Sequence, residues 1–537
     1  MGTSGRLSLS WVNKDRSLVS TQGGGYEWVD RDDVRVTETR LLTDVATVGE
    51  TREERARARD NLLITGDSAE ALRSLTRLPE FADEYRGKVK LVYIDPPFNT
   101  GLTFAHYDDG LEHSIWLTMM RDRLLLIRDL LADEGSLWLE LDDTEMAYCK
   151  VLLDEIFGRS NFISTVLWQR RHSRSNDAVF STSHDYILVY AKNAARFRAV
   201  RNKLPLQPEQ ASDYANPDGD QRGPWRSISF SAPNLRPNLS YEIVAPSGKV
   251  HVPPSGRCWR TTRDAFEKLL EDGRVYFGAG GLGVPRVKQF LSEAPGIVPN
   301  TWWTHQETGH TEEAAKESAA LFGRAAAFST PKPERLLHRI ITIASDPGDI
   351  VLDCFAGSGT TAAVAHKTGR RWVTVERQPE TVDAYVLPRL RKVVEGEDSG
   401  GVSATTGWEK GGGFRHLEVA PSMYERVAGR VLLAPWVEGA AFAAAACAQL
   451  PGFEPDPEAE PPFAGGKGRQ RLAVVDGLVS ESTVRSVVAA LREDERVLIV
   501  AKSYLREAAS LLERLSPGSR IKKAPQDLLD MKGRVLR

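Results

Sequence analysis

One stretch of this 537-residue chain carries side chains that could do chemistry together: Asp95, Pro96, Pro97 and Phe98. It follows the apolar run 91–94, which reads as a short buried strand. Two consecutive prolines cannot continue a sheet or a helix, so the chain must leave the sheet there. The Asp95 carboxylate and the Pro96 carbonyl can accept both hydrogens of an exocyclic amino group, while Phe98 stacks on its ring. We therefore predict a socket for a planar, amino-bearing ring, although an ordinary strand-ending turn would also use these residues.

A second stretch has the form of a nucleotide-binding loop. Residues 349–353 read as another buried strand, and the loop after it contains Gly357 and Gly359 before a helical run. Glycines between a strand and a helix let the backbone approach a ligand closely. Glu376 ends the next apolar run, roughly 20 residues beyond the glycines, which is the spacing of a carboxylate that binds ribose. The pattern departs from the dinucleotide motif G-x-G-x-x-G, so NAD is disfavoured.

Both stretches depend on the elements that come before them. Open α/β sheets bind ligands at the carboxyl ends of their strands, and each stretch follows a predicted strand directly. The strands that end at residues 94 and 353 must therefore lie side by side if one small molecule is to span both motifs. We expect an α/β fold in which segments distant in sequence meet at one edge of a sheet.

In this order, the two stretches resemble the amino-methyltransferases that use S-adenosylmethionine. The amino-group motif precedes the glycine loop, which is similar to the β class of DNA adenine-N6 methyltransferases. The likeness extends to the Mod subunits of type III restriction-modification systems and covers most of residues 10–420. It implies a Rossmann-like methyltransferase fold with a circularly permuted motif order. The further segments that carry it are 61–67, 142–145, 154–158, 161–162, 183–193 and 328–334.

The resemblance implies a role for each matching position. The socket residues would be catalytic, and Asp95, where cytosine-N4 enzymes usually have serine, favours adenine. Phe98 departs from the more usual tyrosine, which preserves stacking and removes a phenol hydroxyl. Asp67 would meet the cofactor's adenine, although its position also suits a helix N-cap. The cofactor would be S-adenosylmethionine, bound by Asp67, Thr330, Lys332, Asp353, Phe355, Gly357, Ser358, Gly359, Thr360 and Glu376.

The bulk composition is that of an ordinary globular protein. The net charge is −3 with histidine neutral, so a nucleic-acid partner needs a local basic groove. The four cysteines lie far apart, which supports neither a disulfide framework nor a zinc site and fits a reducing cytoplasm. No apolar run approaches the ~20 residues of a membrane span. We expect a cytoplasmic protein with no membrane partner.

The chain divides into five predicted parts. Residues 1–60 form an N-terminal extension, 61–203 the first half of the methyltransferase domain, and 301–421 its second half. Residues 204–300 are irregular, rich in Pro and Gly, and occupy the place of a target-recognition domain in the β-class order. Residues 422–537 alternate strand and helix patterns and form a small α/β accessory domain, for which an interaction or dimerisation role is the default.

Double-stranded DNA is the expected partner. Between 168 and 203 the chain turns basic, and basic residues beside Trp168 and Phe180 suit a loop that contacts phosphates near a flipped base. A solvated arginine face is the alternative. In the first region we expect DNA contacts from Trp168, Arg170, Arg171 and Arg174, mainly in the loop 170–177. In the recognition domain we expect them from Arg257, Trp259, Arg260, Arg286 and Lys288.

No metal site is predicted. His305 and His310 stand close to Glu307, but their spacing fits no zinc pattern. The cluster Asp142, Asp143 and Glu145 lacks further ligands and suits helix capping.

The proposed reaction transfers the methyl group of S-adenosylmethionine to adenine N6 in DNA. The rivals are a cytosine-N4 or RNA methyltransferase, and a catalytically silent DNA-binding subunit of a defence complex. The resemblance also implies a restriction-modification or phage-defence setting, with a restriction or helicase subunit as partner and a homodimer as the assembly.

Overall fold

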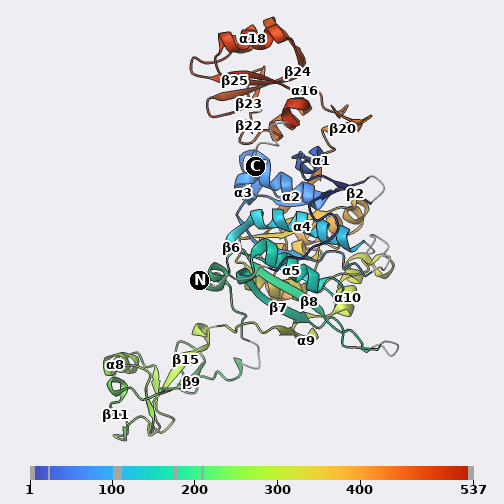
Figure 1. Ribbon diagram of the computed structural model, residues 1–537. Coiled ribbons are helices and arrows are strands. Elements are labelled where there is room, and N and C mark those ends of the chain that lie inside the picture. The colour runs from blue at the N-terminus through green and yellow to red at the C-terminus, as the bar shows by residue number, and fades with distance from the viewer. Residues whose placement is uncertain are drawn as a thin grey trace. The chain divides into compact units, whose positions relative to one another are not determined.

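The computed structural model describes residues 7–21, 25–100, 112–174, 179–206, 211–294, 296–456 and 458–529. The chain forms two compact units, shown in Figure 1. The larger comprises residues 1–202 and 300–537, and the smaller comprises 203–299. The smaller unit coincides within one residue at each end with the predicted insertion, 204–300.

A ten-stranded mixed sheet forms the centre of the larger unit. Its strands are β3 (Leu42–Gly49), β4 (Asn61–Thr65), β5 (Val89–Ile94), β6 (Leu131–Leu141), β7 (Phe162–Trp168), β8 (Asp185–Ala191), β16 (Trp302–Trp303), β17 (Ile350–Asp353), β18 (Arg371–Glu376) and β19 (Gly413–Val419). They lie in the order β16-β7-β8-β6-β5-β17-β18-β4-β19-β3. The late strands β17 and β18 therefore separate the early strands β5 and β4, which confirms the permuted α/β order.

Helices that follow early strands share one hydrophobic core with the sheet. Alternate residues of β4, Leu62 and Ile64, point into this core, as the period-2 pattern of a strand requires. Leu72 and Leu124 meet them from two helices. The helices of this layer are α2 (Ser68–Arg77), α3 (Pro79–Tyr85), α4 (His113–Leu130) and α5 (Met146–Phe157).

A second group of packed helices comes from the second half of the chain. α11 packs on α12, and α12 packs on α14. The bounds are α11 (Glu334–Ala344), α12 (Thr360–Lys367) and α14 (Leu387–Glu395). Elsewhere in the unit lie α6 (Ala194–Val200), α9 (His305–Thr308), α10 (Thr311–Phe322), α13 (Pro379–Thr381) and α15 (Ser403–Thr406).

The N-terminal extension contributes to the sheet. Its last strand, β3, pairs antiparallel with β19 and forms the sheet edge. Before it come the hairpin β1 (Ser17–Ser20) and β2 (Tyr26–Val29) and the short helix α1 (Val34–Thr37).

The smaller unit consists of short strands around an aromatic core. Phe230, Trp259 and Phe266 pack together in that core. The strands are β9 (Trp225–Ser229), β10 (Ser231–Pro233), β11 (Ile243–Val244), β12 (Val250–His251), β13 (Arg257–Trp259), β14 (Val275–Tyr276) and β15 (Arg286–Phe290), and the helix is α8 (Arg263–Glu271).

The C-terminal segment forms a second sheet in the larger unit. Its strands β24, β25 and β26 are parallel, as the sequence pattern predicts, and β22 and β23 extend it antiparallel. The strands are β22 (Glu454–Pro455), β23 (Phe463–Lys467), β24 (Gln470–Val479), β25 (Arg496–Tyr504) and β26 (Arg520–Lys523), and the helices are α16 (Gly439–Ala448), α17 (Glu481–Ala489) and α18 (Arg506–Leu515). A hairpin, β20 (Tyr424–Val427) and β21 (Arg430–Leu433), precedes them.

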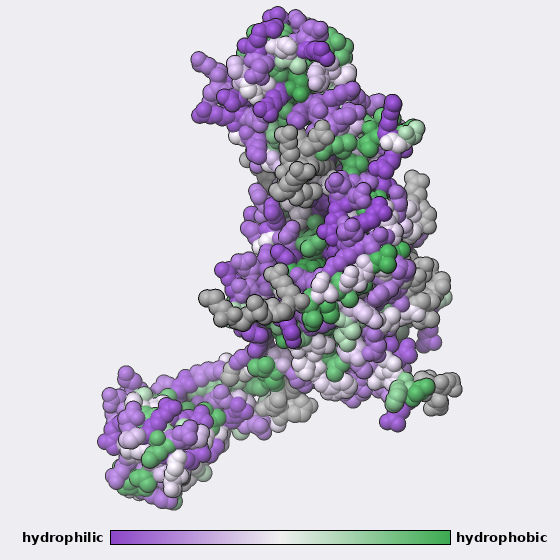
Figure 2. Space-filling view, viewed as in Figure 1, coloured by the Kyte–Doolittle hydropathy of each residue, from purple (hydrophilic) through white to green (hydrophobic). Residues whose placement is uncertain are grey.

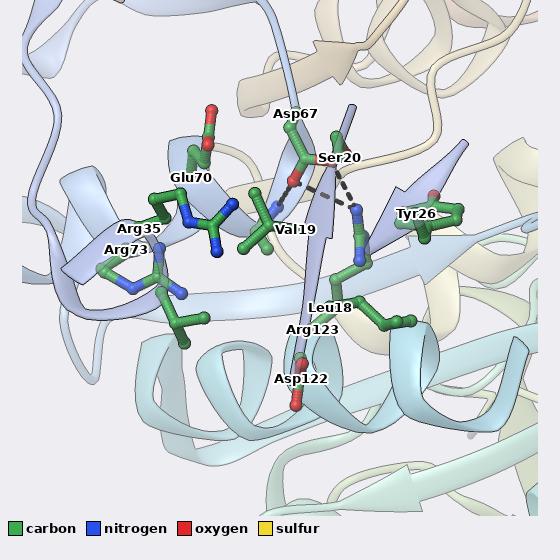
Figure 3. A pocket seen from close by; sticks show the side chains of 12 residues that line it. Leu18, Val19, Ser20, Tyr26, Arg35, Asp67, Glu70, Arg73, Asp122 and Arg123 are labelled. Atoms are coloured by element: carbon green, nitrogen blue, oxygen red, sulfur yellow. Dashed lines mark hydrogen bonds and ion pairs between the residues drawn. The ribbon is translucent and has the colours of Figure 1, made fainter. Parts of the chain in front are cut away.

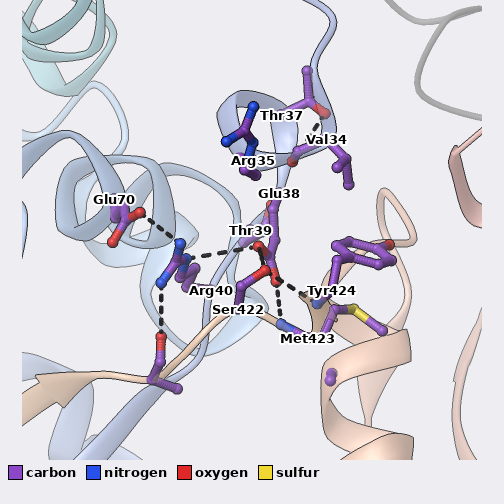
Figure 4. A network of polar contacts seen from close by, with 12 residues as sticks. Val34, Arg35, Thr37, Glu38, Thr39, Arg40, Glu70, Ser422, Met423 and Tyr424 are labelled. Atoms are coloured by element: carbon purple, nitrogen blue, oxygen red, sulfur yellow. Dashed lines mark hydrogen bonds and ion pairs between the residues drawn. The ribbon is translucent and has the colours of Figure 1, made fainter. Parts of the chain in front are cut away.

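Glu38 joins the extension to the start of the C-terminal segment (Figure 4). One carboxylate oxygen accepts the Met423 N–H at 2.7 Å, and the other accepts the Ser422 hydroxyl at 2.6 Å. Arg40 lies 3.6 Å from Glu38 and 2.8 Å from Glu70 of α2. This network therefore links three segments that are far apart in sequence.

Among the described residues, no helix has the length and apolar character needed to cross a membrane. The face of the molecule in Figure 2 is mostly hydrophilic, with hydrophobic residues in small scattered groups.

Candidate functional site

Four carboxylates gather where four neighbouring strands of the large sheet end. Strands β5 and β17 pair in parallel with Leu352 opposite Val92, so both stop at the same edge. Strands β18 and β4 continue the parallel run on the other side of β17. The two predicted motifs therefore lie side by side. The carboxylates at this edge belong to Asp67, Asp95, Asp353 and Glu376.

The turn that carries Asp95 is fixed from several sides. The buried Trp116 indole N–H donates to the Pro97 carbonyl at 2.6 Å. Asn99 has a φ of +63°, a left-handed conformation that asparagine tolerates better than most residues. Its side-chain amide donates to Glu145 at 2.7 Å. Phe98 is half-buried and packs on the edge of the core.

Lys332 reaches this turn from the loop before α11. Its ammonium contacts the Asp95 carboxylate, lies 3.2 Å from Glu140 Oε1, and lies 5.3 Å from the centre of the Phe98 ring. Burial opposes its charge, but the carboxylates of Asp95 and Glu140 outweigh that effect and raise the pKa of Lys332. We predicted Lys332 as a cofactor ligand; its charged group lies on the socket, and a contact with the cofactor stays a prediction.

Glu140 is a fully buried carboxyl group behind the socket. It belongs to β6, and the Tyr93 hydroxyl donates to it at 2.7 Å. Burial raises its pKa from 4.5 to about 8. The nearby Asp185 begins β8 and forms an ion pair with Arg170 at 3.2 Å. Its pKa is also raised, to about 6, chiefly by burial.

Glu376 holds the glycine loop through hydrogen bonds from the backbone. The Gly357 N–H donates to one carboxylate oxygen at 3.0 Å, and the Gln378 N–H donates to the other at 3.1 Å. A carboxylate has about four acceptor sites, so Glu376 can still accept a hydrogen bond from a ribose hydroxyl. Gly357 and Gly359 have φ angles of +51° and +75°, which explains why glycine occupies both positions.

Asp353 supports the same loop from the end of β17. Its carboxylate accepts the Thr361 hydroxyl at 2.6 Å and the Phe355 N–H at 3.0 Å. Burial raises its pKa from 3.8 to about 7. Phe355 is half-buried beside it, while Thr330 is exposed on the other segment expected to bind the cofactor.

Ser358 and Thr360 are buried, and their predicted part in binding the cofactor stays a prediction. Their hydroxyls lie 2.9 Å apart, and the buried Arg389 donates to Thr360 at 2.7 Å. Arg389 also pairs with Glu334 at 2.8 Å. Lys367 completes this network with a 2.9 Å contact to Glu334. The loop therefore depends on buried charges that local sequence patterns did not reveal.

Asp67 lines a small pocket at the hairpin β1–β2, together with Leu18, Ser20 and Tyr26 (Figure 3). It caps α2 by accepting the Ala69 N–H at 2.8 Å, as the N-cap alternative predicts. It also pairs with Arg123 at 2.9 Å and accepts the Ser20 hydroxyl at 2.9 Å. Burial opposes its charge, but Arg123 outweighs burial and lowers the pKa of Asp67. Its predicted contact with the cofactor's adenine stays a prediction.

The predicted DNA contacts of the first region separate into three groups. Trp168 is fully buried and donates to the Gly309 carbonyl at 3.1 Å, so it cannot touch DNA here. Arg170 is committed to Asp185, while Arg171, Arg174 and Phe180 are exposed. The remainder of the predicted loop, residues 175–177, lies outside the described residues.

In the smaller unit, two predicted DNA contacts are also wrong. Trp259 is fully buried, and Lys288 is 7% exposed and pairs with Asp218 and Asp220 at 2.5 and 2.9 Å. Arg260 and Arg286 are exposed, and Arg286 donates to Ser227 at 2.9 Å. Arg257 is half-buried and donates to the Ser231 hydroxyl at 3.0 Å.

Three histidines form a cluster near the end of β7. His172 lies 5.1 Å from His305 and 5.2 Å from His310, measured between ring centres. Within the described ranges, no group of three or more His, Cys, Asp or Glu side chains has the geometry to hold a metal ion. Helix α9 begins at His305. Glu145 stands at the N-cap of α5, as predicted, but its carboxylate makes no hydrogen bond to that helix and bonds Asn99 and His113 instead.

The sequence contained a signal for one missed residue. Glu140 interrupts the apolar run 137–141 at the end of β6, and a buried charge in such a run requires a partner. Arg123 and Arg389 gave no comparable signal, because their partners are distant in sequence.

Comparison with known proteins adds a family. A family model described as DNA methylase (N6_N4_Mtase) matches residues 89–387. The StyLTI Mod subunit of a type III restriction-modification enzyme from Salmonella typhimurium is 34% identical over 56% of this chain and 49% of its own length. The type II methyltransferase M.EcaI from Enterobacter cloacae is 30% identical over 54% of this chain and 62% of its own. The EcoP15I Mod subunit from Escherichia coli is 26% identical over 62% and 61%. The chain thus spans about half to three-fifths of the length of these relatives.

Among solved structures, PvuII DNA methyltransferase (cytosine-N4-specific) is 14% identical over 68% of this chain and 98% of its own. Its TM-score is 0.35, and a likeness at that level carries no weight for the fold.

Proposed function

The chain belongs to the DNA methylase family, and from that premise we propose that it transfers the methyl group of S-adenosylmethionine to N6 of adenine in DNA. One observation carries the proposal. The socket motif and the glycine loop, which are far apart in sequence, end on adjacent parallel strands with Leu352 opposite Val92. Asp95 and Gly357 therefore open onto one edge of the sheet, where one small molecule can reach both.

The donor set at the glycine loop fits S-adenosylmethionine. Glu376 can accept a ribose hydroxyl, and the left-handed backbone at Gly357 and Gly359 lets the loop approach the ligand closely. Asp67 is the expected partner of the adenine. When bound, S-adenosylmethionine supplies a methyl group activated by the positive charge on its sulfur.

The residues of the socket position and polarise the acceptor. Adenine N6 is a weak nucleophile, because its lone pair is shared with the ring. The Asp95 carboxylate and the Pro96 carbonyl accept its two hydrogens and favour a pyramidal nitrogen whose lone pair points at the methyl group. Phe98 stacks on the ring and limits its rotation. Inside a duplex this nitrogen is out of reach, so the base must flip out, at a cost of a few kcal/mol.

Aspartate at position 95 supports adenine over cytosine as the acceptor. The test is direct: the protein, S-adenosylmethionine and DNA are incubated together, and the digested nucleosides are identified by mass spectrometry. We expect N6-methyladenine. N4-methylcytosine would contradict the adenine assignment, and the absence of any methylated nucleoside with retained DNA binding would support a silent subunit.

Asp95→Ala should abolish methyl transfer, with a loss of at least about 1,000-fold in kcat, because positioning and charge at the acceptor nitrogen carry most of the rate. S-adenosylmethionine should bind within about threefold of wild type, because the predicted cofactor ligands lie on other strands. Single-turnover kinetics and calorimetry measure the two effects. Retained activity would remove Asp95 from the mechanism.

The setting follows from the Mod relatives. We propose that the chain is the modification part of a restriction-modification or phage-defence system and works with a restriction or helicase subunit, as a homodimer. Exposed Arg171, Arg174, Arg260 and Arg286 are the proposed DNA contacts. Co-purification with proteins encoded nearby, and light scattering of the purified chain, test the partner and the dimer separately.

A further inference from the structure

Lys332 occupies a stiff position at the centre of the socket. It stands between Pro331 and Pro333, both buried, and proline fixes its own backbone torsion. Its ammonium contacts Asp95 and lies 5.3 Å from the Phe98 ring centre, so it touches both residues that we assign to the acceptor base. Its side chain is only 14% exposed.

The ammonium is held from behind by a second carboxyl group. Glu140 lies 3.2 Å from Lys332 Nζ, is fully buried, and accepts a hydrogen bond from Tyr93. Removing an ammonium from water is costly unless its geometry and further hydrogen bonds compensate. A cation placed this way is too constrained to be an incidental surface pair. The surrounding residues direct the Lys332 ammonium toward Asp95.

We propose that Lys332 is a positioning residue for methyl transfer, which orients the Asp95 carboxylate toward the acceptor amino group, while Glu140 and Tyr93 hold the ammonium in place. The inference rests on the proposed function, because it assumes that Asp95 accepts hydrogens from the amino group. An ammonium bound to one carboxylate oxygen fixes the direction of the other, which accepts a hydrogen of the amino group.

The proposal differs from two other roles for this side chain. As a cofactor ligand, Lys332 would contribute to the affinity for S-adenosylmethionine. As a plug over the Phe98 ring, it would have to leave before a base could enter, and its removal would strengthen binding of the flipped base. A positioning role predicts neither effect and acts on kcat.

Lys332→Met keeps the length of the side chain and removes its charge, and Lys332→Arg restores a charge. We expect Lys332→Met to lower the single-turnover rate at least about 100-fold, with the Kd for S-adenosylmethionine within about threefold of wild type. Lys332→Arg should recover at least about tenfold over the methionine variant. Lys90→Met is the matched control, because Lys90 lies on the same strand as Tyr93 and pairs with Glu134. It should stay within about twofold of wild type.

Three results would overturn the proposal: an unchanged rate in Lys332→Met, a loss confined to cofactor affinity, or a gain in rate or in 2-aminopurine fluorescence that reports base binding. Each requires that the wild type methylates adenine. If the wild type forms no N6-methyladenine, the proposed function fails first and Lys332 is not the cause.

A pH profile gives a readout that a purely structural lysine would not change. The groups that face Glu140 are Lys332, Asp95, Asp185 and Tyr93. As pH rises past about 8, Glu140 ionises and competes with Asp95 for the one ammonium. The wild-type rate should therefore fall above that pH, and Glu140→Gln should flatten the fall. Identical alkaline profiles in the two proteins would contradict this arrangement.

Discussion

Asp353 supports the glycine loop through a carboxyl group whose charge is costly. It is buried at the end of β17, and burial raises its pKa from 3.8 to about 7. An acid with a raised pKa in the folded state releases its proton earlier in the unfolded state, so folding stability falls as pH rises between the two values. The loop is therefore least stable where Asp353 ionises fully.

Asp353→Asn should remove this dependence. The amide keeps one acceptor for Thr361 or Phe355 and cannot ionise. We expect the difference in free energy of unfolding between wild type and variant to shift against the wild type as pH rises from about 4 to about 7, and to stay constant above that. Urea denaturation over this range measures it. A pH-independent difference would mean that Asp353 titrates in the folded protein as it does in the unfolded chain.

At the scale of elements, the turn between β17 and α12 has a shape that only glycine satisfies well. Gly359 has a φ of +75°, and an added Cβ would lie 3.2 Å from Val386. Gly348 shares the strained torsion, with a φ of +88°, but a Cβ there would meet nothing within 4 Å. Alanine at either position introduces backbone strain, but only alanine at Gly359 would also displace the loop. Comparing the two variants therefore distinguishes the two effects.

Gly359→Ala should weaken binding of S-adenosylmethionine by at least about tenfold and cost about 1–3 kcal/mol of stability. Gly348→Ala should cost a similar amount of stability and leave cofactor affinity unchanged. Calorimetry and thermal unfolding measure both quantities. Equal cofactor affinities in the two variants would show that the loop adapts without consequence.

Local sequence patterns predicted the boundaries of those elements that a single residue, such as a proline, begins or ends. The consecutive prolines end β5, and Pro333 stands directly before the first turn of α11, a place that suits proline. The pairing of β5 with β17 was expected, because one small molecule can span the two motifs only if these strands lie side by side. Trp168 was misplaced because aromatic residues serve both cores and DNA surfaces, and burial depends on strands that pair only in the fold.

At the scale of the molecule, long-range ion pairs were beyond local patterns. Lys332 and Glu140 come from the two separate halves of the methyltransferase domain and meet only in the folded chain. Glu334, Lys367 and Arg389 show the same behaviour under the glycine loop. A charged residue in an apolar run indicates that a buried partner exists, but which residue is the partner depends on how the chain folds.

The junction between the extension and the C-terminal segment depends on Glu38, which is 2% exposed and accepts bonds from Ser422 and Met423 (Figure 4). Glu38→Ala should leave both donors without their partner and lower the free energy of local opening at residues 422–450 by about 2–3 kcal/mol, since hydrogen bonds to charged groups are the stronger ones. Hydrogen exchange of peptides from this segment measures the effect. Glu425→Ala is the control, because Glu425 is exposed on the adjoining hairpin and should leave exchange unchanged. Unchanged exchange in Glu38→Ala would show that the apolar contacts of Val34 with this segment hold the junction alone.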